Sequence, residues 1–145
     1  MKALIQRVKK ASVTIDGKLY SKINAGLLVL LGVMKTDTEE NSKALAEKLL
    51  KLRIFEDDNG KMNKSLMDVN GEILVVSQFT LCGDCKKGTR PSFDQSATPE
   101  CANQLYEDFV KFVESSGLVT KTGVFGAMMD VELVNDGPVT FMVEK

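Results

Sequence analysis

Hydrophobic and polar residues alternate along the first part of the chain with a period of two, as expected for strands with one buried face. The alternation covers residues 3–8 and 11–15. Asp16-Gly17 follows at once, and this dipeptide between two apolar segments is typical of a two-residue hairpin turn. The pattern predicts an N-terminal hairpin whose second strand begins near Lys18.

Two later segments are almost continuously apolar. Residues 26–33 ("GLLVLLGV") are typical of a strand that is buried on both faces. Residues 72–79 ("EILVVSQF") predict a further apolar strand. The polar, glycine-containing and basic segment 80–97 follows, and we expect a long functional loop there.

Two segments show the spacing of amphipathic helices. Asp37 is the expected N-cap of a helix over residues 38–52, with Glu40 in the position of a capping box. Thr98-Pro99 begins a second helix, with threonine as N-cap and proline at the first helical position. Gly117 is the expected end of this second helix.

The C-terminal part predicts two more strands, at about residues 124–134 and 139–143, on either side of Asn135-Asp136-Gly137-Pro138. Asp-Gly between apolar segments indicates a hairpin turn that reverses the chain. Together the segments predict one α+β domain over residues 1–145. About six strands would form a curved, barrel-like and mostly antiparallel sheet, covered by two main helices.

Composition excludes several classes of protein. The chain has 145 residues and a net charge of −1, which argues against broad nucleic-acid binding and a DNA partner but leaves room for a local basic patch. No signal peptide pattern begins the chain, and the apolar run over residues 25–34 is too short to span a membrane. Three cysteines are an odd number for a disulfide framework. We therefore expect a cytoplasmic protein without a membrane partner.

The chain contains no histidine. This excludes Ser-His and Cys-His catalytic pairs and the usual zinc sites, so we expect no metal and no cofactor. Any catalysis must use hydroxyls, carboxylates, lysine, backbone groups or the substrate itself.

The 80–97 loop contains two candidate sites. Cys82 and Cys85 form a C-x-x-C motif, but a redox dithiol needs a helix N-terminus beside it, and no helical pattern follows here. The basic cluster of Lys86, Lys87 and Arg90 is either a solvated loop or a contact for a phosphate-bearing partner.

Ser77-Gln78-Phe79-Thr80 ends the second apolar strand. This tetrapeptide is either a polar lip over an apolar pocket or a strand that simply leaves the core. Thr80 could act as a nucleophile, although no base is recognisable beside it. Arg7 lies within the first strand, where its planar side chain could fix the geometry of a backbone or carboxylate partner.

Several segments in order also match a known family: "LIQRV", "GLLVLLGV", "RIFEDDNGKMN", "VVSQFTL", "KGTRPSF" and "GVFGAMMDVELVNDGPVTF". The chain resembles the D-aminoacyl-tRNA deacylases, whose two signature motifs stand intact here as Ser77–Thr80 and Gly137–Thr140. Cys82 and Cys85 lie just after the first motif, in a region that varies within the family.

The resemblance implies hydrolysis of the ester between a D-amino acid, or glycine, and the 3′-terminal adenosine of tRNA. It implies a homodimer with active sites at the interface, where a cis Gly137-Pro138 peptide enters the partner's site, crowds the position of an L side chain and is held by Arg7. The implied catalytic residues are Ser77, Gln78, Phe79 and Thr80. The implied residues for substrate binding and chiral selection are Gly137, Pro138, Val139, Thr140, Arg7, Phe125, Ala127 and Met129.

Three classes of function stay open, and the first of them has two possible mechanisms. Within the deacylase hypothesis, the tRNA 2′-OH could assist while backbone N–H groups near Phe79 and Thr80 stabilise the oxyanion, or Thr80 could attack the ester. A second class is a non-catalytic tRNA-binding module that uses the 86–90 loop. A third is a redox protein that uses Cys82 and Cys85.

Overall fold

The computed structural model describes all residues from 1 to 145. The elements in chain order are β1 (Lys2–Ile15), β2 (Lys18–Ile23), β3 (Gly26–Gly32), α1 (Glu39–Lys51), β4 (Phe55–Glu56), β5 (Met62–Lys64), β6 (Glu72–Ser77), the 3₁₀ helix η1 (Phe79–Cys82), α2 (Pro99–Glu114), β7 (Thr120–Thr122) and β8 (Asp130–Glu144).

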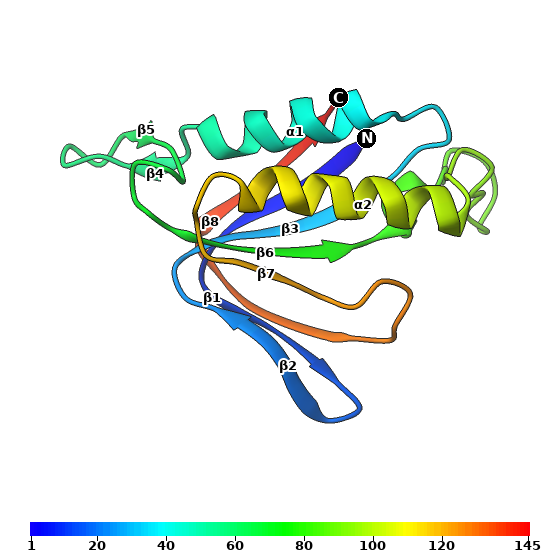
Figure 1. Cartoon of the computed structure of the whole chain (residues 1–145), viewed down its shortest axis with the longest axis horizontal. Coiled ribbons are helices and arrows are strands. Elements are labelled where there is room, and N and C mark those ends of the chain that lie inside the picture. The colour runs from blue at the N-terminus through cyan, green and yellow to red at the C-terminus, as the bar shows by residue number, and fades with distance from the viewer.

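One sheet contains all strands except the small β4–β5 hairpin, in the order β2-β1-β3-β6-β7, with β8 also paired to β1. β1 is antiparallel to β2, β3 and β8, whereas the β3–β6 and β6–β7 pairs are parallel. The predicted barrel-like, two-helix α+β fold is confirmed as a curved mixed sheet, covered by α1 and α2 on one face (Figure 1). No helix is both long and apolar enough to cross a membrane.

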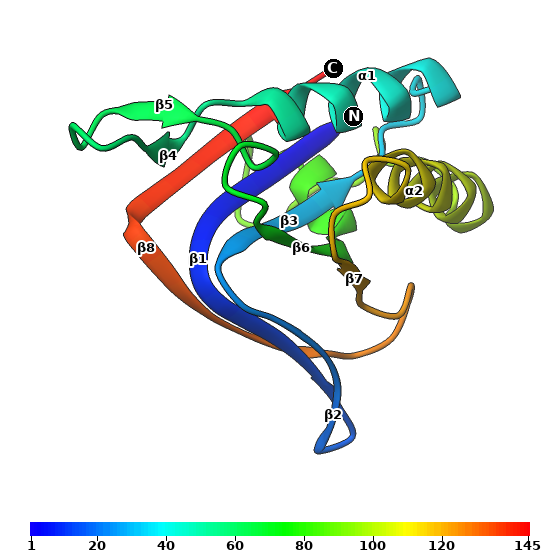
Figure 2. The ribbon, with the colours of Figure 1, turned by 60° about the vertical axis from the view of Figure 1, so that its left-hand side comes forward.

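β1 is strongly curved (Figure 2), and buried side chains form two separate clusters. The first half of β1 pairs with β3, and its second half pairs with β2 and passes to the face of β3 and β6 opposite the helices. Leu27 and Ile73 therefore pack in the larger cluster with helical residues such as Phe109. Their neighbours Leu28 and Leu74 pack in the second cluster. β3 and β6 are buried on both faces, as the unbroken apolar pattern of residues 26–33 predicted.

The two helix starts differ in how closely they match the sequence prediction. α2 begins as predicted, because the Thr98 hydroxyl accepts a hydrogen bond from the Cys101 N–H at 3.4 Å. The prediction that Asp37 caps α1 is wrong: Thr38 is the N-cap, and its N–H donates to the side chain of Asn41 at 2.8 Å. The Asp37 carboxylate instead accepts from the backbone N–H of Met34 at 2.6 Å.

The predicted C-terminal hairpin is also wrong, since β8 runs without reversal and pairs with β1 along both of its halves. Asn135 lies opposite Val8 and Thr140 lies opposite Gln6, so residues 136–139 face Arg7 alone and form a wide bulge. The Asp-Gly-Pro sequence suits an unpaired bulge as well as a turn, because Gly137 adopts φ +128° and proline has no N–H to pair. The strand predicted over residues 124–134 begins only at Asp130, where β8 starts.

Shortening a side chain between the helices and the sheet tests this layered core. Phe109 is fully buried, whereas Phe112 on the same helix is only partly buried. We expect Phe109→Ala to lower the free energy of unfolding by about 3–5 kcal/mol, because it removes buried apolar surface and leaves a cavity. Phe112→Ala, the matched control, should cost less than about 2 kcal/mol. Equal urea midpoints for the two variants at one protein concentration would contradict this packing.

Candidate functional site

A pocket of about 520 Å³ opens where β6 leaves the sheet. It lies at the carboxyl end of the parallel strands β3 and β6, the usual position for ligand sites in sheets with parallel strands. The start of α2 and the segment between β7 and β8 complete its walls. Its lining residues are Val76, Ser77, Gln78, Phe79, Ala97, Pro99, Ala102, Phe125, Gly126, Ala127, Met128, Met129 and Val131.

The first motif forms the polar lip of this pocket. Gln78 still belongs to the edge of the sheet, since its N–H donates to the carbonyl of Leu31 at 2.7 Å. The chain then turns into η1, where residue Phe79 is 57% exposed. The side-chain amide of Gln78 donates to the hydroxyl of Thr80.

Two adjacent backbone N–H groups at this lip have no partner. The first hydrogen bond of η1 runs from the Leu81 N–H to the Gln78 carbonyl. The N–H groups of Phe79 and Thr80 precede it and donate to no other backbone or side-chain group. Free N–H groups beside an apolar pocket are suited to stabilise an oxyanion.

The opposite wall is built from side chains of the segment that follows β7. The ring of Phe125 lies 6.0 Å from the ring of Tyr106, centroid to centroid. The Tyr106 hydroxyl donates to the carbonyl of Val75 at 2.9 Å, and burial raises the pKa of Tyr106 far above its usual range, so this group stays neutral. Met129 reaches the pocket because Gly123 has no side chain: a Cβ there would lie 2.7 Å from the Met129 sulfur.

The second motif lies elsewhere, in the bulge of β8 beside Arg7. Arg7 is 5% exposed, and its guanidinium donates to the carbonyl of Asp136 at 3.1 Å and to that of Ile54 at 2.7 Å. The carboxylates of Glu56 and Asp136 lie 3.6 and 3.5 Å from the same guanidinium. Arg7 therefore ties the bulge to the start of the β4–β5 hairpin.

Further bonds within the bulge fix its shape. The Val139 N–H donates to the side-chain oxygen of Asn135 at 2.7 Å, and the amide of Asn135 donates to the Thr140 hydroxyl at 2.9 Å. Val139 is buried in the core below. A Cβ on Gly137 would lie 2.8 Å from Val139 and 3.0 Å from Arg7, so only glycine fits there. The Gly137-Pro138 peptide bond is cis, and both residues are exposed.

The pairing of the strands shows that the bulge and the pocket lie in different parts of the sheet. Arg7 pairs with Leu27 at the start of β3, and Ser77 pairs with Leu31 near its end, which is about 13 Å along the strands. β1 and β3 also lie between β8 and β6, which adds about 14 Å across the sheet. Followed along and across the sheet, Gly137-Pro138 thus lies about 20 Å from Ser77 of its own chain.

The structure therefore divides the residues predicted from sequence into two groups. Ser77, Gln78, Phe79, Phe125, Ala127 and Met129 line the pocket, and Thr80 contacts Gln78 beside it. The group at the bulge comprises Arg7, Gly137, Pro138, Val139 and Thr140. Sequence reasoning missed Val76, Ala97, Pro99, Ala102, Gly126, Met128 and Val131 as pocket residues, because small and apolar residues in a pocket wall resemble core residues in sequence.

The cysteine motif has no redox geometry. Cys82 is buried, and its thiol donates to the carbonyl of Val33 at 3.3 Å, whereas Cys85 is exposed. Burial raises the pKa of the Cys82 thiol, which disfavours the reactive thiolate. η1 ends at this residue, so Cys82 does not begin a helix.

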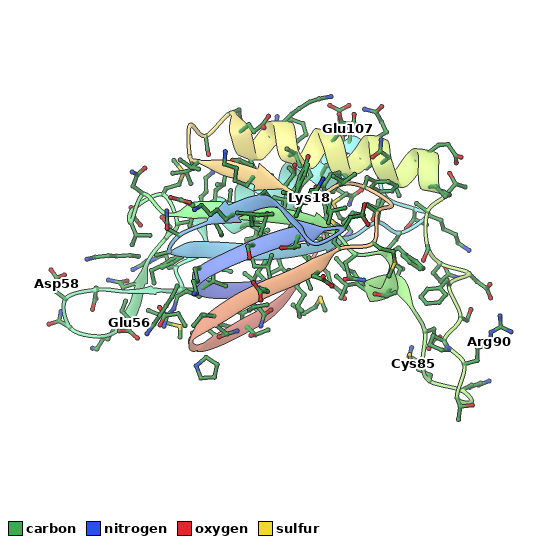
Figure 3. All side chains as sticks on the ribbon, turned by 90° about the horizontal axis from the view of Figure 1, so that it is seen from below. Lys18, Glu56, Asp58, Cys85, Arg90 and Glu107 are labelled. Carbon is green, nitrogen blue, oxygen red and sulfur yellow. The ribbon has the colours of Figure 1, made fainter.

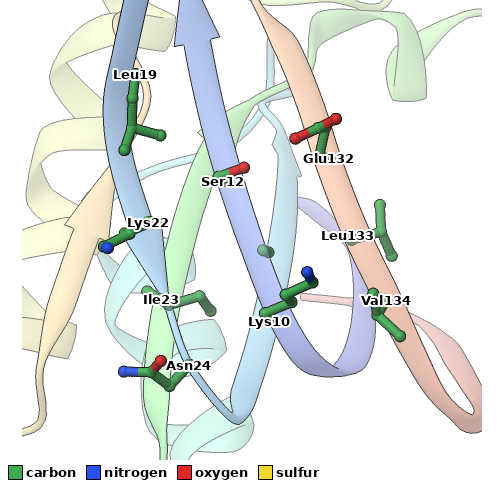
Figure 4. Close-up of a pocket in the computed structure, with 10 residues that line it drawn as sticks. Lys10, Ser12, Leu19, Lys22, Ile23, Asn24, Glu132, Leu133 and Val134 are labelled. Atoms are coloured by element: carbon green, nitrogen blue, oxygen red, sulfur yellow. The ribbon is translucent and has the colours of Figure 1, made fainter.

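A second hollow, of about 560 Å³, lies on β1, β2 and β8 (Figure 4). Lys10, Lys22 and Glu132 line it together with apolar residues such as Leu19 and Val134. None of the residues predicted for the site lines this hollow. The pocket at Ser77–Phe79 is therefore the candidate functional site.

Replacing Arg7 by lysine tests its role in holding the bulge. Lysine keeps the charge but cannot reach both carbonyls with the planar geometry of a guanidinium, so we expect a loss of about 1–3 kcal/mol in the free energy of unfolding. Arg53→Lys is the control, because Arg53 also donates to a carbonyl, that of Asn63 at 2.7 Å, but is exposed. That control should change stability by less than about 0.5 kcal/mol. If both variants unfold at the same urea concentration, Arg7 is not the anchor of the bulge.

Comparisons with known proteins agree on one family. A profile of the D-Tyr-tRNA(Tyr) deacylase family matches residues 4–144. A protein of Desulfatibacillum aliphaticivorans named D-aminoacyl-tRNA deacylase is 62% identical over 99% of this chain and 99% of its own. The protein of the same name from Thermosipho africanus is 59% identical over 99% of this chain and 97% of its own.

Solved structures share the fold. The c-Myc DNA unwinding element binding protein superposes with a TM-score of 0.94 at 44% identity, covering 100% of this chain and 99% of that one. A probable eukaryotic D-amino acid tRNA deacylase superposes with a TM-score of 0.87 at 19% identity over 99% and 98% of the two chains, which shows the fold alone. Both motifs are present, and the family profile matches nearly the whole of this chain, so the chain belongs to the D-Tyr-tRNA(Tyr) deacylase family.

Proposed function

We propose that this chain is an enzyme that hydrolyses the ester between a D-amino acid and the 3′-terminal adenosine of tRNA, releasing free amino acid and tRNA. The names of its close, full-length relatives support this reaction. The same relatives favour an enzyme over a tRNA-binding module without activity. The buried Cys82 speaks against the redox alternative.

The observation that carries the proposal is the pair of free N–H groups at Phe79 and Thr80 on the lip of an apolar pocket. In the proposed complex, the terminal adenosine occupies the pocket against Phe125 and Met129. The ester carbonyl lies at the lip, where both N–H groups point at the oxygen that becomes negative in the tetrahedral intermediate. Positioning and oxyanion stabilisation together suffice for an ester that is already activated.

The proposed mechanism needs no basic side chain. Water attacks the ester carbonyl carbon, the bond from that carbon to the ribose 3′-oxygen breaks, and the 3′-oxygen takes up a proton. The neighbouring ribose 2′-OH assists the proton movement. Thr80 is a poor nucleophile in this arrangement, because its hydroxyl oxygen already accepts a hydrogen bond from Gln78 and no base contacts it.

We further propose that chiral selection comes from a second copy of the chain. The Gly137-Pro138 bulge is exposed and rigidly held, but it lies too far from its own pocket to act there. In a homodimer it would enter the partner's pocket and place backbone carbonyls where an L side chain would lie. Exclusion by fixed backbone discriminates against one hand without requiring attraction to the other. Glycine has no side chain to exclude, so glycyl-tRNA would also be hydrolysed.

Two substitutions at one position separate the two roles proposed for Thr80. Thr80→Ala removes the hydroxyl but keeps the N–H, and we expect it to hydrolyse D-tyrosyl-tRNA at nearly the wild-type rate. Thr80→Pro removes the N–H, which makes no hydrogen bond within η1, and should lower kcat about 10²–10³-fold. Single-turnover rates for the two folded variants are the measurement. If Thr80→Ala is as inactive as Thr80→Pro, which lacks both the hydroxyl and the N–H, the Thr80 hydroxyl is the nucleophile instead.

Mixed dimers test the action of the bulge on a partner subunit. Gly137→Ala displaces the bulge, because its Cβ would contact Val139 and Arg7, and it should raise hydrolysis of L-tyrosyl-tRNA about tenfold or more. Co-expression with excess Thr80→Pro subunits supplies an intact bulge to each working pocket. Hydrolysis of L-tyrosyl-tRNA should then fall while hydrolysis of D-tyrosyl-tRNA persists.

The control uses excess subunits that carry both Thr80→Pro and Gly137→Ala. These cannot supply an intact bulge, so L-tyrosyl-tRNA hydrolysis should stay high. Unchanged hydrolysis of L-tyrosyl-tRNA with either excess subunit would mean that the bulge does not act across the interface.

A further inference from the structure

The loop between η1 and α2 projects beyond one end of the sheet (Figures 1 and 3). Ala97, near the end of this loop, lines the pocket. The loop is a folded hairpin-like segment, because Asp84 and Ser92 exchange two backbone hydrogen bonds of 2.8 and 3.0 Å. The Asp84 carboxylate accepts the Lys86 N–H at 2.8 Å and shapes the turn. Figure 3 shows Cys85 and Arg90 far out on this loop.

The tip of the loop presents three cations without partners. Lys86, Lys87 and Arg90 are exposed, and no carboxylate lies within ion-pair distance of any of them. This concentration of positive charge contrasts with the net charge of −1 on the whole chain. A local basic cluster on an acidic protein favours a partner with closely spaced negative charges.

An exposed aromatic pair connects the loop to the pocket. The rings of Phe79 and Phe93 lie 5.0 Å apart, centroid to centroid, with 57% and 37% of the residues exposed. Phe93 fits closely because Gly83 has no side chain: a Cβ there would lie 3.0 Å from the Phe93 ring. Phe79 lines the pocket and Phe93 belongs to the loop, so the pair bridges the two.

We propose that this surface binds the single-stranded nucleotides of tRNA that precede the terminal adenosine. This proposal rests on the proposed function, in which the terminal adenosine occupies the pocket. The Phe79–Phe93 pair stacks against a base of the adjoining nucleotides, while Lys86, Lys87 and Arg90 contact their phosphates. Aromatic side chains that alternate with cations are the usual means of holding single-stranded nucleic acid. If the partner were instead an acidic protein, it could bind the three cations, but the Phe79–Phe93 pair would then have no role.

The first test compares two substrates of different length. The triple variant Lys86→Ala, Lys87→Ala, Arg90→Ala should raise KM for D-tyrosyl-tRNA and leave kcat unchanged. Hydrolysis of 3′-O-(D-tyrosyl)adenosine, which has no phosphates, should be unaffected. The matched control removes three exposed cations of α1 that also lack ion-pair partners: Lys43, Lys48 and Lys51. This control should behave as wild type with both substrates.

Salt dependence gives a quantitative expectation. Three contacts to single-strand phosphates make the slope of log(kcat/KM) against log[salt] steeper by about 2. Between 50 and 200 mM salt, wild-type kcat/KM for D-tyrosyl-tRNA should therefore fall about 20-fold more than that of the triple variant. Parallel slopes for the two proteins would overturn the phosphate contacts.

Two variants of Phe93 test whether the aromatic pair stacks on the tRNA. Phe93→Ala should raise KM for D-tyrosyl-tRNA about fivefold or more, because it removes a stacking surface, whereas Phe93→Tyr should retain the wild-type value. Neither should change hydrolysis of 3′-O-(D-tyrosyl)adenosine. If Phe93→Ala and Phe93→Tyr behave alike, the aromatic pair does not stack on the tRNA.

A binding measurement separates this proposal from the proposed function. An RNA hairpin with a four-nucleotide single-stranded 3′ end should bind wild type more tightly than the triple variant, and a blunt hairpin should bind both equally. If wild type hydrolyses 3′-O-(D-tyrosyl)adenosine but the two proteins bind the tailed hairpin equally, only the loop proposal fails. If wild type hydrolyses no D-tyrosyl ester, the proposed function fails, whatever the binding result.

Discussion

A buried guanidinium on β1 determines where the second signature motif lies. Arg7 follows a run of core positions on the strand, and a charge there is unfavourable unless its donors are satisfied. The carbonyls of Ile54 and Asp136 satisfy it from two separate elements. At Arg7, β8 leaves the β1 register for four residues, and this departure is the Gly137-Pro138 bulge. The hydrogen bond from Arg7 to the Asp136 carbonyl therefore holds the bulge whose tip, Gly137-Pro138, is exposed.

The pocket arises from a different part of the fold and a different physical cause. Parallel strands β3 and β6 end at the same edge of the sheet, and the chain leaves β6 through a 3₁₀ helix. The change from strand to helix removes the partners of two successive N–H groups without burying them. A binding pocket and an exposed rigid backbone segment therefore exist in the same chain about 20 Å apart. The proposed dimer would bring the pocket of one subunit and the bulge of the other together, and selection of the hand of the substrate would then require the dimer.

Local patterns predicted the elements whose shape is decided locally. The start of α2 could be predicted because Thr98-Pro99 is a local helix-start signal. β3 could be predicted because a short apolar segment between glycines is typical of a strand with two buried faces. The prediction of a turn at Asp136-Gly137 was wrong because these residue types suit a turn or a bulge equally well. Which of the two forms depends on whether β8 pairs with β1 on both sides of them, as it does here. Pocket residues such as Ala102 and Val131 could not be recognised, since their role depends on which elements the fold brings opposite Ser77. The motif residues themselves were identified by family resemblance rather than by pattern.

The most direct test of the proposed account is the hydrolysis of tRNA charged with tyrosine of each hand and with glycine. Purified wild-type protein should release D-tyrosine and glycine rapidly while leaving L-tyrosyl-tRNA intact under the same conditions. Comparable single-turnover rates for L- and D-tyrosyl-tRNA would contradict the exclusion of the L side chain by the Gly137-Pro138 bulge.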